Sequence, residues 1–422
     1  MDNGPPRGTR DLLPDSVARR EAVIAELARS YGRFGFRRIE TPCIEDIDRL
    51  TWGEGGDNEK LIYRILRRGL DPIVAAETPL ADVVDLGLRY DLTVPLTRFY
   101  ANNAGKLVSP YRSMQIGPVW RAERPQRGRY RQFTQCDIDT IGEPSVLAEA
   151  ELLEGTLAAL AAIGIERVTV RVNDRRLLAS MALEAGVDAE ALAPFFVTLD
   201  KLDRIGWQGV RAELAERGYT HAVGARCEQV VALLASAETA SEALDRASDL
   251  LPALPESVLA DLRATFDALG RIEATAPPEA VASRLDASVV RGMGYYTGQI
   301  FEFAHPDAPS SIAGGGRYDG LIGRSLGTPV AACGISIGFD RVVEMARFSP
   351  PDLGVAVLYA EGEPPDEVLE TARRLRSAAG AAALVALRGQ RRLQLESLQK
   401  EGYTSFVVVE AGSVSQERPI RP

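Results

Sequence analysis

The chain has few histidines and few cysteines, and this scarcity excludes several kinds of site. Its 422 residues include two histidines, His221 and His305, so a metal site built from several histidines is excluded. The four cysteines are far apart, without a CxxC pair, which excludes a cysteine-based zinc site and favours the reducing cytoplasm. Catalysis by a histidine base has few candidates. His305 lies in the turn-like AHPDAP and is expected at the surface.

The sequence also lacks long apolar runs and nucleotide-binding loops. No stretch of about 18 apolar residues occurs, so no membrane span is expected. The N-terminal MDNGPPRGTRDLLPD has no apolar core for a signal peptide. There is no Walker A sequence, no GxGxxG after a strand and no GxSxG. At 45% hydrophobic and 26% charged residues, the composition is that of an ordinary globular protein, long enough for two or three domains.

One arginine-rich stretch, residues 121–139, stands out because the chain as a whole is acidic, with a formal charge of −10. It reads RAERPQRGRYRQFTQCDID and holds five arginines, with Glu123 as the one acid before its last three residues. A local excess of guanidinium suggests a bound phosphate, although a solvated charged hairpin is the alternative. Strand-like residues on both sides of Pro125 and Gly128 predict a long antiparallel hairpin with an arginine-rich tip.

Periodicity along the rest of the chain predicts an α+β protein. A helix is expected to end near Tyr31, and FGFRRIETPCIED then reads as strand, kink and strand, forming either core or a dimer face. Further strands are expected at 61–66, 86–90, 168–173 and within 283–305, and helices through 98–100 and over 145–165. Residues 177–269 are helical throughout, which indicates an inserted subdomain. After a linker at 348–352, a βαβαβ pattern predicts a small α/β domain.

Several segments outside the hairpin carry candidate binding groups. Asp91 and Thr93, at a strand-to-helix junction, could hold an ammonium group or could form an N-cap pair. The three glycines of SSIAGGGRYDG could form a loose loop or let a ligand approach the backbone. Arg121, Arg291 and Arg341 could converge on one phosphate, as phosphoryl or nucleotidyl chemistry requires. A carboxylate nucleophile is already ionised at pH 7, which suits a chain with so few histidines.

In order, these segments resemble the class II aminoacyl-tRNA synthetases, and specifically the histidyl-tRNA synthetase family. IETPCIED resembles motif 1, the dimer motif, VWRAERPQRGRYRQFTQCDID resembles motif 2, and GISIGFDRV resembles motif 3. RGMGYYTG and GGGRYDGL resemble the histidine-specific signatures, and LRYDLTVP the amino-acid-binding segment. The resemblance covers about residues 1–347 and implies an antiparallel sheet flanked by helices, built as a homodimer.

The resemblance also implies a domain organisation. Residues 1–176 and 276–347 would form the two parts of the catalytic domain, and residues 177–275 the helical insertion between them. Residues 353–422 would form a short anticodon-binding-like α/β domain, although the usual closing motif is not recognised in ERPIRP. The arginines of that domain could follow a phosphate backbone or form an ordinary charged face: Arg373, Arg374, Arg376, Arg388, Arg391 and Arg392.

Roles in binding ATP follow from the same resemblance. Arg121 would hold the α-phosphate and the histidine carboxylate, Glu123 would meet the adenine amino group, and Phe133 would stack on the adenine ring. Arg341 would bind the γ-phosphate of a bent ATP, which carries its own Mg²⁺. Arg291 would bridge the α-phosphate and the carboxylate in the transition state, where other class II enzymes place a metal.

The remaining implied roles concern histidine and tRNA. Seven residues would bind histidine: Asp91, Thr93 and Gln135 at the α-amino group, Arg291 at the carboxylate, and Asp139, Tyr296 and Tyr318 at the imidazole. Arg121, Arg291 and Gln135 would act in catalysis. Gln126, at the hairpin tip, would lie near the acceptor end of the tRNA.

Two departures from the family leave three interpretations of function open. Gly294 stands in RGMGYYTG where the family usually has an acid, which predicts a modest loosening of that loop, and the C-terminal domain is short. The first interpretation is a ligase that joins histidine to tRNA-His with ATP. The second is a histidine-binding regulatory paralogue like the regulatory subunit of ATP phosphoribosyltransferase, which the intact motif 2 argues against. The third is a paralogue that adenylates histidine for an acceptor other than tRNA.

Overall fold

The computed structural model describes residues 3–51, 61–70, 78–124, 130–290, 295–347 and 352–420. The chain forms two compact units, Met1–Asp11 with Ile24–Arg347, and Leu12–Val23 with Phe348–Pro422. Helix α1 (Pro14–Gly32), expected from the sequence, is shared between them. Within the described ranges, no helix combines the length and the apolar character needed to cross a bilayer.

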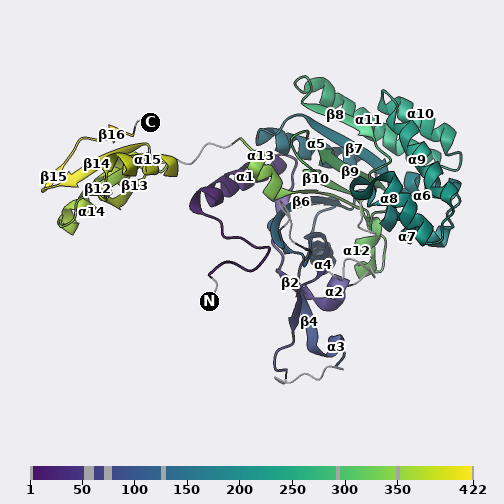
Figure 1. The fold of residues 1–422 in the computed structure, drawn as a ribbon, viewed down its shortest axis with the longest axis horizontal. Coiled ribbons are helices and arrows are strands. Elements are labelled where there is room, and N and C mark those ends of the chain that lie inside the picture. Colours follow the sequence, from purple (N-terminus) through teal and green to yellow (C-terminus); the bar gives the residue numbers. More distant parts are fainter. Residues whose placement is uncertain are drawn as a thin grey trace. The chain divides into compact units, whose positions relative to one another are not determined.

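The first unit is built on an eight-stranded sheet in the order β1-β5-β6-β11-β10-β9-β7-β8 (Figure 1). Its strands in that order are β1 (Arg37–Arg38), β5 (Tyr111–Trp120), β6 (Gln132–Ile141), β11 (Ala332–Ile337), β10 (Ala313–Arg317), β9 (Gln299–Ala304), β7 (Val168–Asp174) and β8 (Val281–Leu285). Neighbours are antiparallel except at the two edges, where β1–β5 and β7–β8 are parallel. The predicted antiparallel sheet is confirmed.

The long hairpin predicted around the arginine-rich stretch is also confirmed. Strands β5 and β6 pair from Tyr111 opposite Ile141 to Trp120 opposite Gln132. Residues of a strand point alternately to its two faces. Cys136 and Ile138 of β6 are completely buried, whereas Gln135 and its alternate neighbours line a cavity. The expected arginine-rich tip, residues 125–129, lies outside the described residues.

Helices cover both faces of this sheet (Figure 1). Helix α5 (Leu147–Ala162) packs on β6 and β11, α13 (Phe339–Met345) on β6, and α11 (Glu256–Thr275) on α5 and β8. On the other face, α4 (Thr93–Asn103), which continues into η2 (Ala104–Lys106), packs on α12 (Asp319–Leu326). A buried ion pair joins sheet and helix, because Arg317 of β10 donates from Nε and Nη2 to the two oxygens of Glu149 in α5, each at 2.6 Å.

A smaller sheet in the same unit contains the second strand of the segment expected to be strand, kink and strand, whereas the first, β1, lies at the edge of the large sheet. It has the order β2-β4-β3, with β2 (Ile44–Asp46), β4 (Val84–Leu88) and β3 (Arg64–Leu66). The short helices α2 (Ile47–Thr51) and α3 (Leu80–Val83) adjoin it. The strand predicted at 61–66 begins only at Arg64, where pairing with β4 starts.

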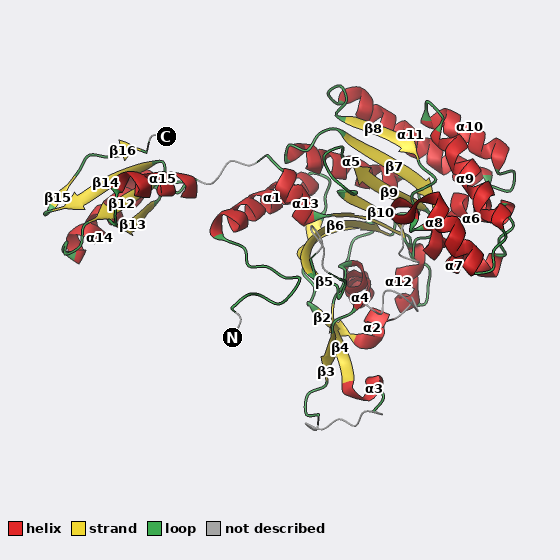
Figure 2. Cartoon of the chain, viewed as in Figure 1, coloured by secondary structure: helices red, strands yellow, loops and turns green. Residues whose placement is uncertain are grey.

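The stretch expected to be helical throughout is confirmed as helical (Figure 2). It comprises α6 (Arg175–Glu184), η3 (Ala189–Ala191), α7 (Leu192–Leu199), α8 (Leu202–Glu216), α9 (His221–Ala235), α10 (Ala240–Leu250) and α11. Asp174 caps α6 by accepting the Arg176 N–H, and Thr239 caps α10 by accepting the Glu242 N–H. That residues 177–275 form an inserted domain of their own stays a prediction.

The second unit contains the predicted βαβαβ pattern. It runs through β12 (Val355–Tyr359), α14 (Pro365–Ala379), β13 (Ala382–Ala386), α15 (Arg391–Glu401) and β14 (Ser405–Glu410), with parallel strands in the order β13-β12-β14. Alternate residues of β12 build two cores, Val355 and Val357 with Val368 of α14, and Ala356 and Leu358 with Leu398 of α15. Two short strands, β15 (Ser413–Val414) and β16 (Arg418–Pro419), pair with β14 and were not expected.

Candidate active site

A cavity of about 980 Å³ lies over the middle strands β6, β11, β10 and β9. A concave site with several polar groups is the usual form of a ligand pocket. All described residues that the sequence assigned to a site line it: Asp91, Thr93, Arg121, Glu123, Phe133, Gln135, Asp139, Tyr296, Tyr318 and Arg341. Arg291 and Gln126 lie outside the described residues, as does Gly294. Residues separated by 250 positions therefore meet in one cavity.

Glycines of two neighbouring strands, β10 and β11, line the cavity. The three consecutive glycines belong to strand β10, so they do not form the loose loop that was one of the alternatives. A Cβ on Gly315 would lie 1.9 Å from the carbonyl oxygen of Gly334 in β11. A Cβ on Gly334 would lie 2.0 Å from Oδ1 of Asp139. Only glycine at position 334 leaves the Asp139 carboxylate where it is.

At one end of the cavity a carboxylate and a phenol face each other. The Tyr318 hydroxyl donates a 2.6 Å hydrogen bond to Oδ1 of Asp139, and both side chains are buried. Burial raises the pKa of Asp139 to about 7, although the Tyr318 hydrogen bond acts in the opposite direction. Tyr296 packs beside Tyr295, with ring centroids 4.8 Å apart. This end can enclose a flat ring and accept an N–H from it.

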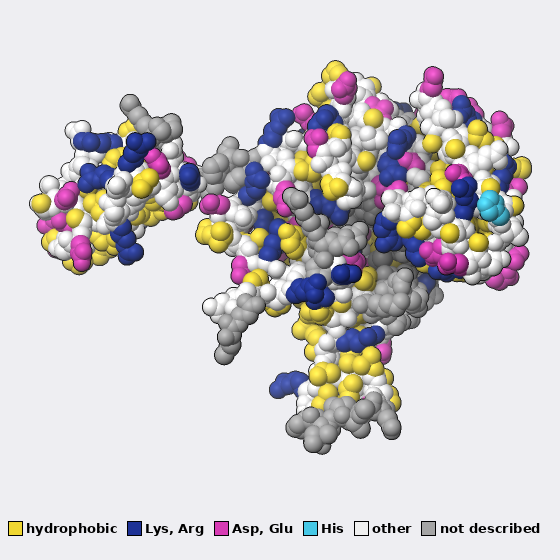
Figure 3. Space-filling view, in the orientation of Figure 1, with side chains coloured by type: hydrophobic (Ala, Val, Ile, Leu, Met, Phe, Trp, Pro, Cys, Tyr) yellow, Lys and Arg dark blue, Asp and Glu magenta, His cyan; other side chains and the backbone are white. Residues whose placement is uncertain are grey.

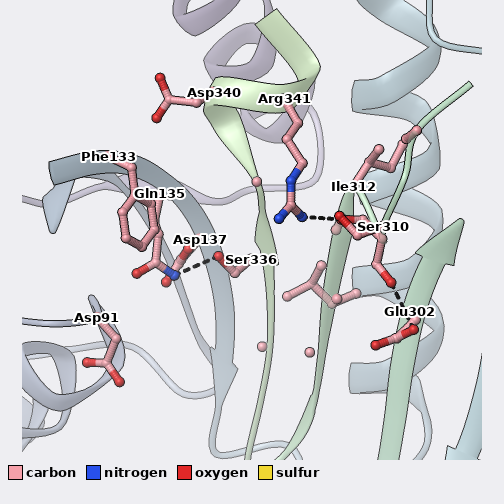
Figure 4. A pocket seen from close by; sticks show the side chains of 18 of the residues that line it. Asp91, Phe133, Gln135, Asp137, Glu302, Ser310, Ile312, Ser336, Asp340 and Arg341 are labelled. Atoms are coloured by element: carbon pink, nitrogen blue, oxygen red, sulfur yellow. Dashed lines mark hydrogen bonds between the residues drawn. The ribbon is translucent and has the colours of Figure 1, made fainter. Parts of the chain in front are cut away.

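A second group of acceptors, Asp91 and Gln135, lines the same cavity (Figure 4). Asp91 accepts the Val94 N–H at Oδ1, at 3.0 Å, but the N-cap residue of α4 is Leu92, so Asp91 and Thr93 do not form the N-cap pair that was one of the alternatives. Oδ2 of Asp91 has no hydrogen-bond partner among the described residues. Gln135 donates from Nε2 to Ser336 Oγ at 2.9 Å, and its buried Oε1 has no partner in that same set. Burial raises the pKa of Asp91. The bond to Val94 therefore leaves one Asp91 oxygen for a ligand.

Two arginines and an aromatic ring line the other end of the cavity. Arg121, just past the end of β5, donates from Nε to the Tyr90 carbonyl at 3.0 Å, and its guanidinium lies 5.1 Å from the centre of the Phe133 ring. Arg341, in the first turn of α13, points into the cavity and donates to the Ser311 carbonyl at 2.6 Å (Figure 4). Cations beside an aromatic face suit the phosphates and base of a nucleotide.

The start of α13 is fixed to the hairpin by the residue before Arg341. Asp340 accepts the backbone N–H of Thr134 at 2.9 Å and pairs with Arg10 at 2.6 Å. The Arg10 guanidinium also lies 4.1 Å from the centre of the Tyr130 ring. These contacts tie β6 and α13 together, so that Phe133 and Arg341 keep their places on opposite sides of the cavity.

Several lining residues were missed by sequence reasoning. Asp137 lies between Gln135 and Asp139 on β6 and follows the same alternation, which is a signal that the sequence contained. His305 was expected at the surface, but its side chain is 7% exposed and lines the cavity, because Nδ1 accepts the Asp307 N–H and folds the ring inward. The junction of α7 and α8 also borders the cavity, through Asp200, Asp203 and Arg204.

Comparison with known sequences gives a consistent result. A family model described as histidyl-tRNA synthetase matches residues 8–342. The chain is 45% identical over 431 residues to the histidine–tRNA ligase of Leifsonia xyli subsp. xyli (strain CTCB07), covering 99% of this chain and 98% of that protein. It is 39% identical over 438 residues to the probable histidine–tRNA ligase of Tropheryma whipplei (strain Twist), covering 99% of both.

Solved structures share the fold. The crystal structure of histidyl-tRNA synthetase from Nostoc sp. PCC 7120 matches with a TM-score of 0.75 at 23% identity, covering 99% of this chain and 97% of that one. An ATP phosphoribosyltransferase regulatory subunit/histidyl-tRNA synthetase from Bacillus halodurans C matches with a TM-score of 0.75 at 21% identity, covering 97% and 100%. The family model and the full-length relatives together show that the chain belongs to the histidyl-tRNA synthetase family of class II aminoacyl-tRNA synthetases.

Proposed function

We propose that the chain activates histidine with ATP to histidyl-adenylate and transfers it to tRNA-His. The observation that carries this proposal is that one cavity holds the Asp139–Tyr318 pair, Phe133, Arg121, Arg341 and acceptors without a partner among the described residues. The relatives matched over their full length carry the name histidine–tRNA ligase. The matches cover 98% and 99% of these two relatives, C-terminal domain included, which disfavours a regulatory paralogue that lacks this domain.

In the first step a carboxylate oxygen of histidine attacks the α-phosphorus of ATP, and the bond to pyrophosphate breaks. The carboxylate is already ionised, so the step needs no protein base. Arg121 neutralises the negative charges that meet at the α-phosphate, and Arg341 holds the γ-phosphate. Phe133 stacks on adenine and Glu123 accepts from its amino group. Arg291 bridges carboxylate and α-phosphate in the transition state.

The histidine substrate is held at both of its ends. Asp91, Thr93 and Gln135 bind the α-amino group, and Asp139, Tyr296 and Tyr318 enclose the imidazole. Gln135 thereby also orients the carboxylate for attack. The described residues contain no group of three or more His, Cys, Asp or Glu placed to hold a metal. In the proposed reaction Mg²⁺ comes with the ATP phosphates. When bound there, Mg²⁺ neutralises phosphate charge.

In the second step a ribose hydroxyl of the tRNA attacks the activated carbonyl carbon, and AMP leaves. We place Gln126 near the acceptor end. We divide the chain into catalytic parts at 1–176 and 276–347, the helical insertion at 177–275, and an anticodon-binding-like domain at 353–422. The cysteines at positions 43, 136, 227 and 333 form no disulfide bonds, which is consistent with the cytoplasmic location that we propose.

We also propose a homodimer through the small sheet. Four large apolar side chains on β2, β3, α3 and β4 are exposed: Ile44, Leu66, Leu80 and Leu86. They contribute to the apolar surface visible on this part of the molecule (Figure 3). An exposed apolar cluster marks an interaction surface, and β2 lies in the segment that resembles the dimer motif. A second copy of the chain is the partner that this resemblance implies.

The deciding experiment is ATP–pyrophosphate exchange with purified full-length chain, Mg²⁺ and each of the twenty amino acids, followed by aminoacylation of a tRNA-His transcript. We expect exchange with histidine and charging of the transcript. Absence of exchange would leave the regulatory paralogue, and exchange without charging would leave the paralogue with another acceptor. Arg291→Ala should abolish exchange while histidine binding stays measurable, because the α-amino and imidazole contacts of histidine remain.

A further inference from the structure

Asp137 has no role in the site as assigned so far, yet its position is that of a binding residue. Gln135, Asp137 and Asp139 are alternate residues of β6, so their side chains point to the same face of the sheet, and all line the cavity. Asp137 is 4% exposed, and its Oδ1 has no hydrogen-bond partner among the residues described. Buried carboxylate oxygens normally accept a hydrogen bond, so a donor from a bound ligand is expected here.

Two other acceptors in the same cavity share this property. Oδ2 of Asp91 and Oε1 of Gln135 are also buried and without a donor in the described part of the chain. In Figure 4 Asp91 lies on the same side of the view as Gln135 and Asp137, which both belong to β6. A primary ammonium group has three N–H donors and no acceptor, so it can satisfy three such oxygens at once.

The surroundings of Asp137 hold its carboxylate in this arrangement. Ser336 accepts the Gln135 side-chain N–H at 2.9 Å, and its own hydroxyl hydrogen-bonds to Asp137. One serine on β11 therefore orients both β6 side chains, leaving Oε1 of Gln135 and Oδ1 of Asp137 available. Burial, and then the nearby Asp139 and Asp91, raise the pKa of Asp137, whereas Arg121 lowers it. Such a carboxylate gains from the arrival of a cation.

We propose that Asp137 is the third acceptor for the α-ammonium group of bound histidine, together with Asp91 and Gln135. The inference rests on the proposed function in that histidine is taken as the ligand. It assigns Asp137 to the amine and Asp139, two residues further along the strand, to the imidazole. The two carboxylates then recognise opposite ends of the same substrate.

The test compares two ligands that differ only in the amine. Calorimetry on the full chain measures the dissociation constants of histidine and of 3-(imidazol-4-yl)propionate, which keeps the ring and the carboxylate. Asp137→Asn should raise the dissociation constant of histidine by about tenfold to a hundredfold, as expected for the loss of a hydrogen bond to a charged group. The dissociation constant of the propionate should change by no more than about twofold. The matched control, Asp139→Asn, should raise the dissociation constants of both ligands, because both carry the imidazole ring.

Two results would overturn the inference: unchanged histidine affinity in Asp137→Asn, or equal weakening of both ligands, which indicates a purely structural role. Thermal unfolding of both variants establishes that they are folded, and Ser336→Ala, which releases Asp137 without removing it, should reproduce a smaller part of the same discrimination. If the unsubstituted chain does not bind histidine, the proposed function falls together with this inference. If it binds histidine and Asp137→Asn binds it equally well, the inference alone fails.

Discussion

Replacing Asp139 by asparagine tests two effects of this carboxylate separately, its contribution to histidine binding and its effect on the stability of the unliganded protein. Asparagine has the same shape, but its one oxygen is the atom that accepts from Tyr318, so an NH₂ group would face the azole ring. The charged hydrogen bond to the ring N–H is lost, at about 1.5–3 kcal/mol. The Michaelis constant for histidine in ATP–pyrophosphate exchange should therefore rise by about tenfold to a hundredfold.

The same substitution should stabilise the protein without ligand. The pKa of Asp139 is raised from 3.8 to about 7 by burial, so the ionised form is disfavoured in the fold by at most about 4 kcal/mol at 1.36 kcal/mol per unit. For an acid whose pKa is raised by folding, this penalty is complete above pH 7 and disappears as the pH falls below 3.8. Asp139→Asn should therefore unfold at a higher temperature than the unsubstituted chain at pH 8, and the gain should shrink at pH 5.

The outcome that refutes this reasoning is specific. An unchanged Michaelis constant for histidine would remove Asp139 from the imidazole pocket. A lower unfolding temperature of Asp139→Asn at pH 8 would show that the carboxylate is stabilising in the unliganded fold, contrary to the burial argument. The Michaelis constant for ATP serves as the internal control, because Arg121, Phe133 and Arg341 are left in place.

Four further predictions test other parts of the structure. Histidine affinity should fall as the pH drops below about 7, where Asp139 takes up a proton. An azole analogue of histidine whose ring stays neutral should show the same fall, and a flat profile would contradict it. Gly334→Ala should raise the Michaelis constant for histidine by displacing Asp139, whose Oδ1 would lie 2.0 Å from the new Cβ, whereas Gly270→Ala meets nothing within 4 Å and should not. Glu149→Gln should lower the free energy of unfolding by at most about 3–5 kcal/mol, because it removes the buried carboxylate that Arg317 contacts twice at 2.6 Å and leaves the longer 3.3 Å pair with Asp319. The control is Glu151→Gln, which breaks the more exposed ion pair with Arg112 and should lower the free energy of unfolding by about 1 kcal/mol or less. Urea titration measures both variants. Leu66→Glu should dissociate the proposed dimer in sedimentation, whereas Leu393→Glu, on the equally exposed surface of α15, should leave it intact; dissociation by both would argue against the small sheet as the interface.

Local pattern was enough to predict much of the fold. The β5–β6 hairpin, the helical stretch from α6 to α11 and the βαβαβ unit each depend on periodicities within about 10 to 20 residues. The order of strands in the large sheet was not predictable in this way, because β7 and β9 pair across more than a hundred residues. The glycines of β10 carry no strand preference, and their place in the sheet is set by the neighbouring strands β9 and β11.

The residues of the candidate site also divide into those that the sequence predicted and those that only the tertiary fold brings together. Residues that the family resemblance matched were expected together, and the structure places those it describes in one cavity. Arg171, Asp203 and His305 were not expected there, since they reach it from β7, from the helical stretch and from the turn after β9. No local periodicity relates these three segments, so only the tertiary fold could bring them to the cavity.

Asp91 shows that one carboxylate can contact a helix and still offer an acceptor. A carboxylate has two oxygens, and the first-turn N–H of Val94 in α4 uses Oδ1, so this contact does not occupy Oδ2. The hydrogen bond to Val94 also orients the side chain. Burial raises the pKa of Asp91, Asp137 and Asp139 alike, so this cluster destabilises the unliganded protein as the pH rises and each acid ionises. A cationic amine and an azole N–H would supply hydrogen-bond donors that these carboxylates lack among the described residues. The cluster of three buried acids is therefore better explained by ligand binding than by the stability of the sheet.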